Sequence, residues 1–111
     1  QRPHPPILVA GAAPWGPRRA ARYGDGWMPL GGPHDPVQLV KQLRDAAEAA
    51  GRASTDLTLS LFGAPTRPER LAALRDAGVD RVIFFLPPDD QAKILPRLDR
   101  YRQLMADLGE L

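Results

Sequence analysis

The sequence predicts an α/β fold of four consecutive βα units with parallel strands. Short apolar runs typical of strands alternate with segments whose apolar residues recur at helical spacing. Such alternation favours parallel pairing through crossover helices. Each unit spans roughly 25–30 residues, close to the ~30 residues per unit of an eightfold barrel. Four units would form half of a TIM (β/α)8 barrel, and a small open α/β sheet is the alternative.

The first unit combines a strand over 7–10 with a helix over 14–23. The run ILVA is continuously apolar, as a strand buried on both faces requires. The helix tolerates Pro14 and Pro17 because both lie in its first turn. Gly24 then suits the end of this helix.

The second unit starts with GWMPL at 26–30, and the Gly-Gly-Pro at 31–33 ends this strand. Asp35 is expected to cap a helix that runs to 50, with Gln38 placed for a capping box. The apolar residues of the helix predict one buried stripe, which comprises Pro36, Val40, Leu43, Ala47 and Ala50.

The third unit begins with LTLSLF at 57–62, in which leucines alternate with other residues. The T-x-x-E pattern at 66–69 predicts a capping box. It opens a helix that runs to 77, with Leu71 and Leu74 facing inward, and Gly78 closes it.

The fourth unit begins with RVIFFL at 81–86 and is stopped by the Pro-Pro that follows. Asp89 or Asp90 is expected to start the last helix. Pro96 interrupts the helical pattern, which predicts a kink or a late helix start near Leu95. The apolar face of the helix is expected to consist of Ile94, Leu98, Tyr101, Met105 and Leu108.

Composition limits the class of protein. The 111 residues fit a single domain over 1–111, and the start at Gln1 without methionine indicates a fragment, a processed product or an excised piece. The absence of cysteine excludes disulfides and thiolate metal sites and is compatible with a reducing cytoplasm. Two histidines form no metal-ligand spacing, so no metal site is expected. No basic run indicates nucleic acid, and no apolar run approaches the ~20 residues of a membrane span.

The strongest local signal follows the first strand. Gly11, Ala12, Ala13 and Pro14 form a turn of small residues directly before a helix. Such a turn lets backbone N–H groups approach a ligand, and the positive end of the helix lies beside it. We interpret these four residues as a phosphate-binding turn of a cofactor site, with a plain tight turn as the alternative.

The string PPILVAGAAPWGPRRAARYGDGWMP resembles the flavin- and deazaflavin-dependent luciferase-like monooxygenase superfamily. The family pattern is P-P-I-x-V-G-G, a small helix start, R-R-A-A-R and G-D-G-W-x-P. The later AGVDRVIFFLPP resembles the end of the last helix–strand pair in that family. Nearly the whole chain is covered, and it corresponds to the C-terminal half of the family's barrel. Ala10 departs from the pattern, because the family has glycine there.

The resemblance implies a TIM-like barrel that binds FMN or coenzyme F-420 at the carboxyl ends of its strands. It implies hydride transfer or flavin-based oxygenation, with phosphate contacts from the turn that matches Gly11, Ala12 and Ala13. The family's substrate-acting histidine and acidic residues belong to the N-terminal half. We therefore expect no catalytic residue here, and an oxidoreductase only as part of a full barrel.

Three further residues are considered as candidate catalytic or substrate-binding residues. Asp25 follows a helix, which assigns it to the face opposite the catalytic one, and we expect a hydrogen-bonding role in its turn. His34 and Arg67 follow strands and are candidate substrate contacts. An exposed loop histidine and a surface arginine are the alternatives for these two.

The expected partner is a flavin-type cofactor together with either the missing N-terminal half or a second copy of the chain. A half-barrel leaves two strand edges and its interior face uncovered, so a homodimer could close the barrel. A small phosphate- or nucleotide-binding α/β module is the remaining alternative.

Overall fold

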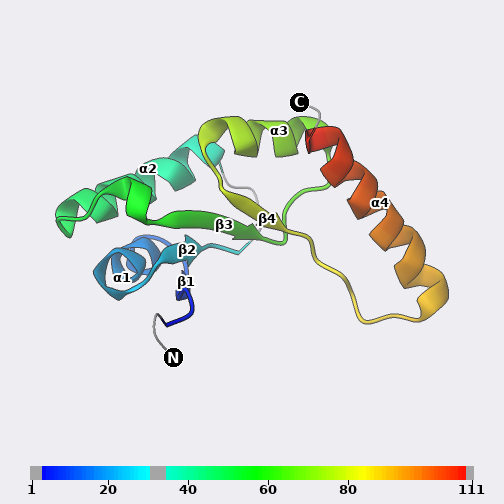
Figure 1. The fold of residues 1–111 in the computed structure, drawn as a ribbon, viewed down its shortest axis with the longest axis horizontal. Helices are drawn as coiled ribbons and strands as arrows, with labels where there is room; N and C mark the ends of the chain where they lie inside the picture. The colour runs from blue at the N-terminus through cyan, green and yellow to red at the C-terminus, as the bar shows by residue number, and fades with distance from the viewer. Residues whose placement is uncertain (1–3, 31–34, 110–111) are drawn as a thin grey trace.

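Four short strands and four α-helices alternate along the chain, which confirms the four βα units (Figure 1). The computed structural model describes residues 4–30 and 35–109. In this part of the chain, no helix combines the length and the apolar character needed to cross a membrane. The elements are β1 Leu8–Ala10, α1 Trp15–Tyr23, β2 Gly26–Met28, α2 Pro36–Ala49, η1 Ser54–Asp56, β3 Thr58–Phe62, α3 Pro68–Ala77, β4 Arg81–Ile83 and α4 Gln91–Gly109.

All strand pairs are parallel, and the strand order is β1-β2-β3-β4. Each strand therefore pairs with its neighbour in sequence, as in a segment of a barrel. In doubly wound open sheets, the order of the strands instead reverses at a switch point. The sheet order is thus consistent with half of a (β/α)8 barrel.

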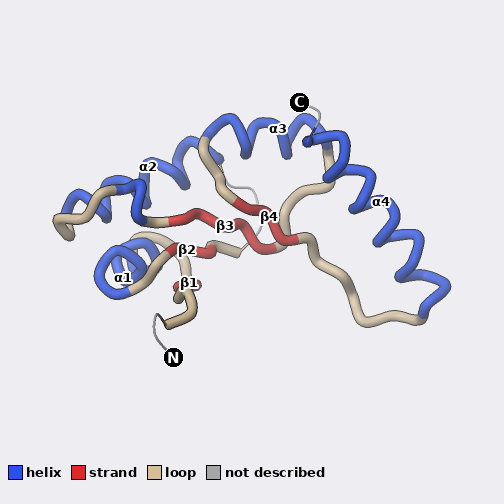
Figure 2. Tube along the Cα trace, viewed as in Figure 1, coloured by secondary structure: helices blue, strands red, loops and turns tan. Residues whose placement is uncertain are grey.

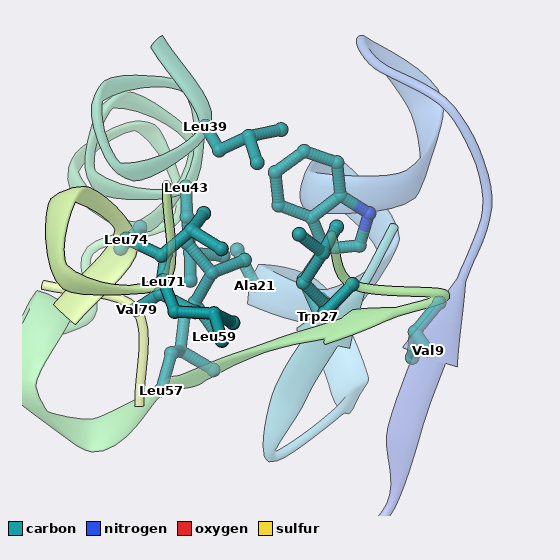
Figure 3. Close-up of a cluster of buried hydrophobic side chains, with 14 of the residues drawn as sticks. Val9, Ala21, Trp27, Leu39, Leu43, Leu57, Leu59, Leu71, Leu74 and Val79 are labelled. Atoms are coloured by element: carbon teal, nitrogen blue, oxygen red, sulfur yellow. The ribbon is translucent and has the colours of Figure 1, made fainter. Parts of the chain in front are cut away.

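The core lies between one face of the sheet and the helices α1, α2 and α3. Val9, Trp27 and Leu59 are register partners on three strands, so their side chains share this face (Figure 3). All three are buried against leucines and alanines of the helices. Burial of each large apolar side chain contributes about 1.5–3 kcal/mol.

The opposite face of the sheet has no helix over it in the described ranges (Figure 2). The helix α4 packs beside α3 and extends away from the sheet. The Cα radius of gyration is accordingly 15.3 Å, larger than the about 13 Å of a compact chain of this length. The face of the sheet opposite the core is thus open in the described part of the chain, and we call it the open face.

Two aspartates join the amino ends of neighbouring strands in the same way. The Ile7 N–H donates to Asp25 Oδ2 at 2.7 Å, and the Asp25 N–H donates to the Ile7 carbonyl at 2.7 Å. Leu59 and Asp80 repeat this reciprocal pair, at 2.8 and 2.9 Å. The hydrogen-bonding role expected for Asp25 is confirmed, at the end of the sheet opposite the Gly11 turn.

All four described strands are shorter than expected. The expected strand over 81–86 ends at Ile83, because Phe84 turns to stack on Tyr101 of α4, with ring centroids 4.6 Å apart. The strand expected over 26–30 ends at Met28, since Pro29 has no N–H for the ladder, and Leu30 forms an isolated bridge. The strands expected over 7–10 and 57–62 each begin one residue later than expected.

Helix ends follow most of the expected signals. Asp35 caps α2 by accepting from the Val37 N–H at 3.0 Å, and Gly78 closes α3 in the left-handed conformation. The capping box at 66–69 is wrong, because Arg67 is the N-cap and makes no side-chain cap bond. The helix expected to run to about Ala50 ends at Ala49, with Ala50 as its C-cap.

Two apolar stripes differ from expectation. In α2, Leu39 is buried with Leu43 and Ala47, whereas Ala50 lies past the helix end and is exposed. In α4, the helix begins at Gln91 and continues through Pro96, so the late start near Leu95 is wrong. Leu104 of α4 is buried instead of Met105, which is 61% exposed. The last helix contacts mainly α3, so only a narrow strip of it is covered.

Arg52 closes the carboxyl end of α1 from a distant loop. Its Nη1 donates to the carbonyls of Ala21 and Gly24 at 3.2 and 2.7 Å and more weakly to that of Ala20.

Arg52→Ala should lower the free energy of unfolding by about 1–2 kcal/mol, because these carbonyls lose a charged donor. Urea denaturation measures this loss. Arg22→Ala, on the exposed face of α1, is the matched control, and an equal loss there would contradict the capping role.

Candidate functional site

The turn after β1 carries the candidate site. Gly11 has a φ of +126°, which a residue with a side chain rarely adopts. A Cβ at this position would also lie 2.7 Å from Arg19 Nη2. Ala12, Ala13 and Pro14 follow on the surface, and Trp15 begins α1. Glycine is therefore required at this bend for both conformation and space.

Several backbone donors of this turn are unused. Within residues 4–30 and 35–109, the N–H groups of Ala12, Ala13 and Trp15 donate to no acceptor. Pro14 and Pro17 have no N–H, and the Gly16 N–H is used by the Ala12 carbonyl at 2.8 Å. The first turn of α1 therefore offers fewer free N–H groups than an ordinary helix start. Most of the free N–H groups belong to Ala12 and Ala13 of the turn before it.

A guanidinium group lies beside Gly11, at the start of this turn. Arg19 Nη2 donates to the Ala10 carbonyl at 3.3 Å, at the carboxyl end of β1. Helical side chains point toward the helix N-terminus, so an arginine one turn into α1 reaches back over the strand end. The site thus combines backbone N–H groups with one positive charge, a donor set suited to a phosphate.

The turn borders a cavity of about 380 Å³ at the carboxyl ends of β1 and β2. No acidic residue is among the described residues that line it. These are Gly11, Ala12, Ala13, Trp27, Pro29, Leu30, Leu39 and Gln42. A second cavity of about 420 Å³ lies between α1 and α2 and shares Ala13 and Gln42 with the first. Its acidic residue, Asp45, accepts from Lys41 Nζ at 2.8 Å, and this hydrogen bond raises the pKa of Lys41.

The turn after β3 has a similar sequence, but its backbone N–H groups are already hydrogen-bonded. Gly63 also has a positive φ and also follows a strand. Its N–H and that of Ala64 both donate to the Ile83 carbonyl, at 2.8 and 3.1 Å. These donors are used inside the sheet, so an anion is not expected there. Of these two turns, both within the described residues, the turn at Gly11 keeps its N–H groups free.

The other candidates lie apart from this turn. Arg67 is exposed at the start of α3, after the third strand of the sheet, and does not line the cavity at Gly11. His34 lies outside the described residues. In the described ranges, no group of three or more histidine, aspartate or glutamate side chains could hold a metal ion. Arg19 was not among the residues expected at this turn, although its position one turn into the helix could have indicated its contact with the strand end.

Comparison with known proteins gives a consistent result. The model of the family described as luciferase-like monooxygenase matches residues 1–107. The uncharacterized proteins Rv0953c of Mycobacterium tuberculosis and Mb0978c of Mycobacterium bovis are each 34% identical to the chain over 105 residues. The aligned region covers 87% of this chain and only 36% of each relative.

The family match and the observed fold agree. Four parallel βα units in sequential order are compatible with the barrel that the resemblance implied. Because the match covers nearly all of its 111 residues, the chain belongs to the luciferase-like monooxygenase family.

Proposed function

We propose that the chain is the cofactor-phosphate-binding, C-terminal half of the barrel of a flavin- or deazaflavin-dependent luciferase-like oxidoreductase. The observation that carries this proposal is the Gly11–Ala13 turn, which has free N–H groups and begins where the Arg19 guanidinium contacts the end of β1. Members of the family generally use FMN or coenzyme F-420, and both carry a phosphate. The donor set fits that group, and the cavity beside it presents no acidic side chain from the described residues.

The role of this chain is to bind and orient. Ala12 and Ala13 would donate backbone hydrogen bonds to phosphate oxygens, and Arg19 would balance their charge. The bound cofactor would supply hydride transfer or oxygen activation. Nothing in the described residues combines an acid or base with this cavity, so the chain alone is proposed to be inactive. The reacting groups would come from the rest of the barrel.

Titration with FMN and with coenzyme F-420, followed by protein fluorescence, tests this proposal. At least one of them should bind, because the phosphate donors are present in this chain. Reoxidation of reduced FMN should be no faster with the chain than without it. Efficient catalysis by the chain alone would contradict the proposed division of roles. A preference for a nucleotide without a flavin ring would instead support a small nucleotide-binding module.

Arg19→Ala should weaken FMN binding about three- to tenfold at low salt, because a charge-assisted contact to phosphate is lost. Calorimetric titration at two salt concentrations measures the change. Arg22→Ala removes the same charge from the same helix and is the control. If both variants lose the same affinity, only the net charge of the helix matters and Arg19 is not a specific contact.

A second candidate function is self-association through the open face of the sheet. Apolar side chains on this face include Leu8, Met28, Phe62 and Ile83, which lie opposite the covered face by strand alternation. Phe85, just beyond β4, is 55% exposed. A parallel sheet is normally covered on both faces, so a second copy could bury these residues and close an eight-stranded barrel.

Sedimentation velocity at rising concentration tests this candidate. The parent chain should form a dimer, and Phe85→Glu should shift the equilibrium toward monomer by placing a charge in the apolar interface. Val37→Glu changes an exposed apolar residue on α2, away from the open face, and should have no effect. A parent chain that stays monomeric at high concentration would eliminate this second function.

A further inference from the structure

Trp27 uses its single polar atom on the candidate turn. The side chain is 1% exposed and lies beside Leu39 in the core (Figure 3). Its Nε1 donates to the Gly11 carbonyl at 2.8 Å. A buried indole needs an acceptor, and here the acceptor is the bend that carries the free donors. The largest of the fully buried side chains is therefore in direct contact with the proposed phosphate turn.

Gly16 allows this contact to form. It is buried in the first turn of α1, and a Cβ there would overlap the Gly11 carbonyl oxygen and lie 2.6 Å from Trp27 Nε1. The Gly16 N–H also donates to the Ala12 carbonyl at 2.8 Å. Two successive carbonyls of the turn, at Gly11 and Ala12, are thus held by Trp27 and by the helix start.

Because peptide bonds are planar, these two contacts also determine where the Ala12 and Ala13 N–H groups point. In a trans peptide the C=O of one residue and the N–H of the next point in opposite directions. The Gly11–Ala12 and Ala12–Ala13 bonds are trans. Since the Gly11 carbonyl faces the buried indole, the Ala12 N–H faces away from the core. Since the Ala12 carbonyl faces Gly16, the Ala13 N–H faces away from the helix.

We propose that Trp27 is a positioning residue, which together with Gly16 orients the Ala12 and Ala13 N–H groups toward a phosphate of the bound cofactor. This proposal rests on the proposed function. Without the indole N–H, the Gly11 carbonyl would have no buried donor and the peptide could rotate. The turn at Gly63 lacks such a support, and its N–H groups donate to Ile83.

Trp27→Phe tests the proposal, because phenylalanine keeps the aromatic packing and removes the donor. FMN affinity should fall about three- to tenfold, as expected for the loss of one buried hydrogen bond. The backbone amide signals of Ala12 and Ala13 in a nitrogen-15 NMR spectrum should shift in the absence of ligand. A merely structural role would lower stability, measured separately by urea denaturation, and leave these amides and the affinity of the folded protein unchanged.

Trp15→Phe is the matched control. Trp15 is 67% exposed at the start of the same helix, stacks with Arg18 and makes no bond to the turn. It should bind FMN as the parent chain does. Gly16→Ala is a second variant that removes no core volume, and its new Cβ should displace the Gly11 carbonyl and weaken binding in the same way. It keeps the test decisive if Trp27→Phe does not fold.

The outcomes separate the two proposals. If the parent chain binds FMN and both variants bind equally well, the positioning role is wrong and the proposed function stands. If the parent chain binds neither FMN nor coenzyme F-420, the proposed function fails, and the cofactor part of this inference fails with it. Unshifted Ala12 and Ala13 amides in both variants would overturn the positioning role whatever the binding result.

Discussion

Burial of the layer between the sheet and α1, α2 and α3 is the constraint on which the other features depend. Trp27 and the leucines of β3 are covered by alanines of α1 and leucines of α2 and α3. Because the strands are only three to five residues long, few ladder bonds hold them, and packing on one face must supply most of the stability. The same layer places the indole of Trp27 beneath the Gly11 turn.

The two ends of the sheet have different tasks. At the amino ends, Asp25 and Asp80 pair reciprocally with Ile7 and Leu59, so these carboxylates serve the scaffold. At the carboxyl ends, the described turns at Gly11 and Gly63 differ in whether their backbone N–H groups are free. This difference separates a turn that is open to an anion from a turn that only completes the sheet. Asp25 is a poor catalytic candidate because it lies at the amino ends of the strands and its carboxylate accepts from the Ile7 N–H.

Local sequence signals were sufficient for most of the fold. The Asp35 cap and the helix end at Gly78 depend on residues only a few positions away, and both are seen in the structure. The apolar runs that predict the strands are equally local. Two local signals failed, the capping box at 66–69 and the late helix start near Leu95. The other failures involve distant partners. Phe84 leaves its strand for Tyr101, and Leu104 rather than Met105 is buried because α3 covers only one strip of α4. No pattern within a strand or helix reports which neighbour will cover it.

The same division applies to the site. Sequence alone determined the βα order, the small-residue turn at Gly11 and the family, because these depend on residue types at short spacing. Tertiary structure alone decided that the Ala12 and Ala13 donors are free, while those of Gly63 and Ala64 are used. It also brought Trp27 and Arg19 to the turn. The reason is physical: a backbone donor is free or bound according to which strand or helix lies beside it, and that is a property of packing.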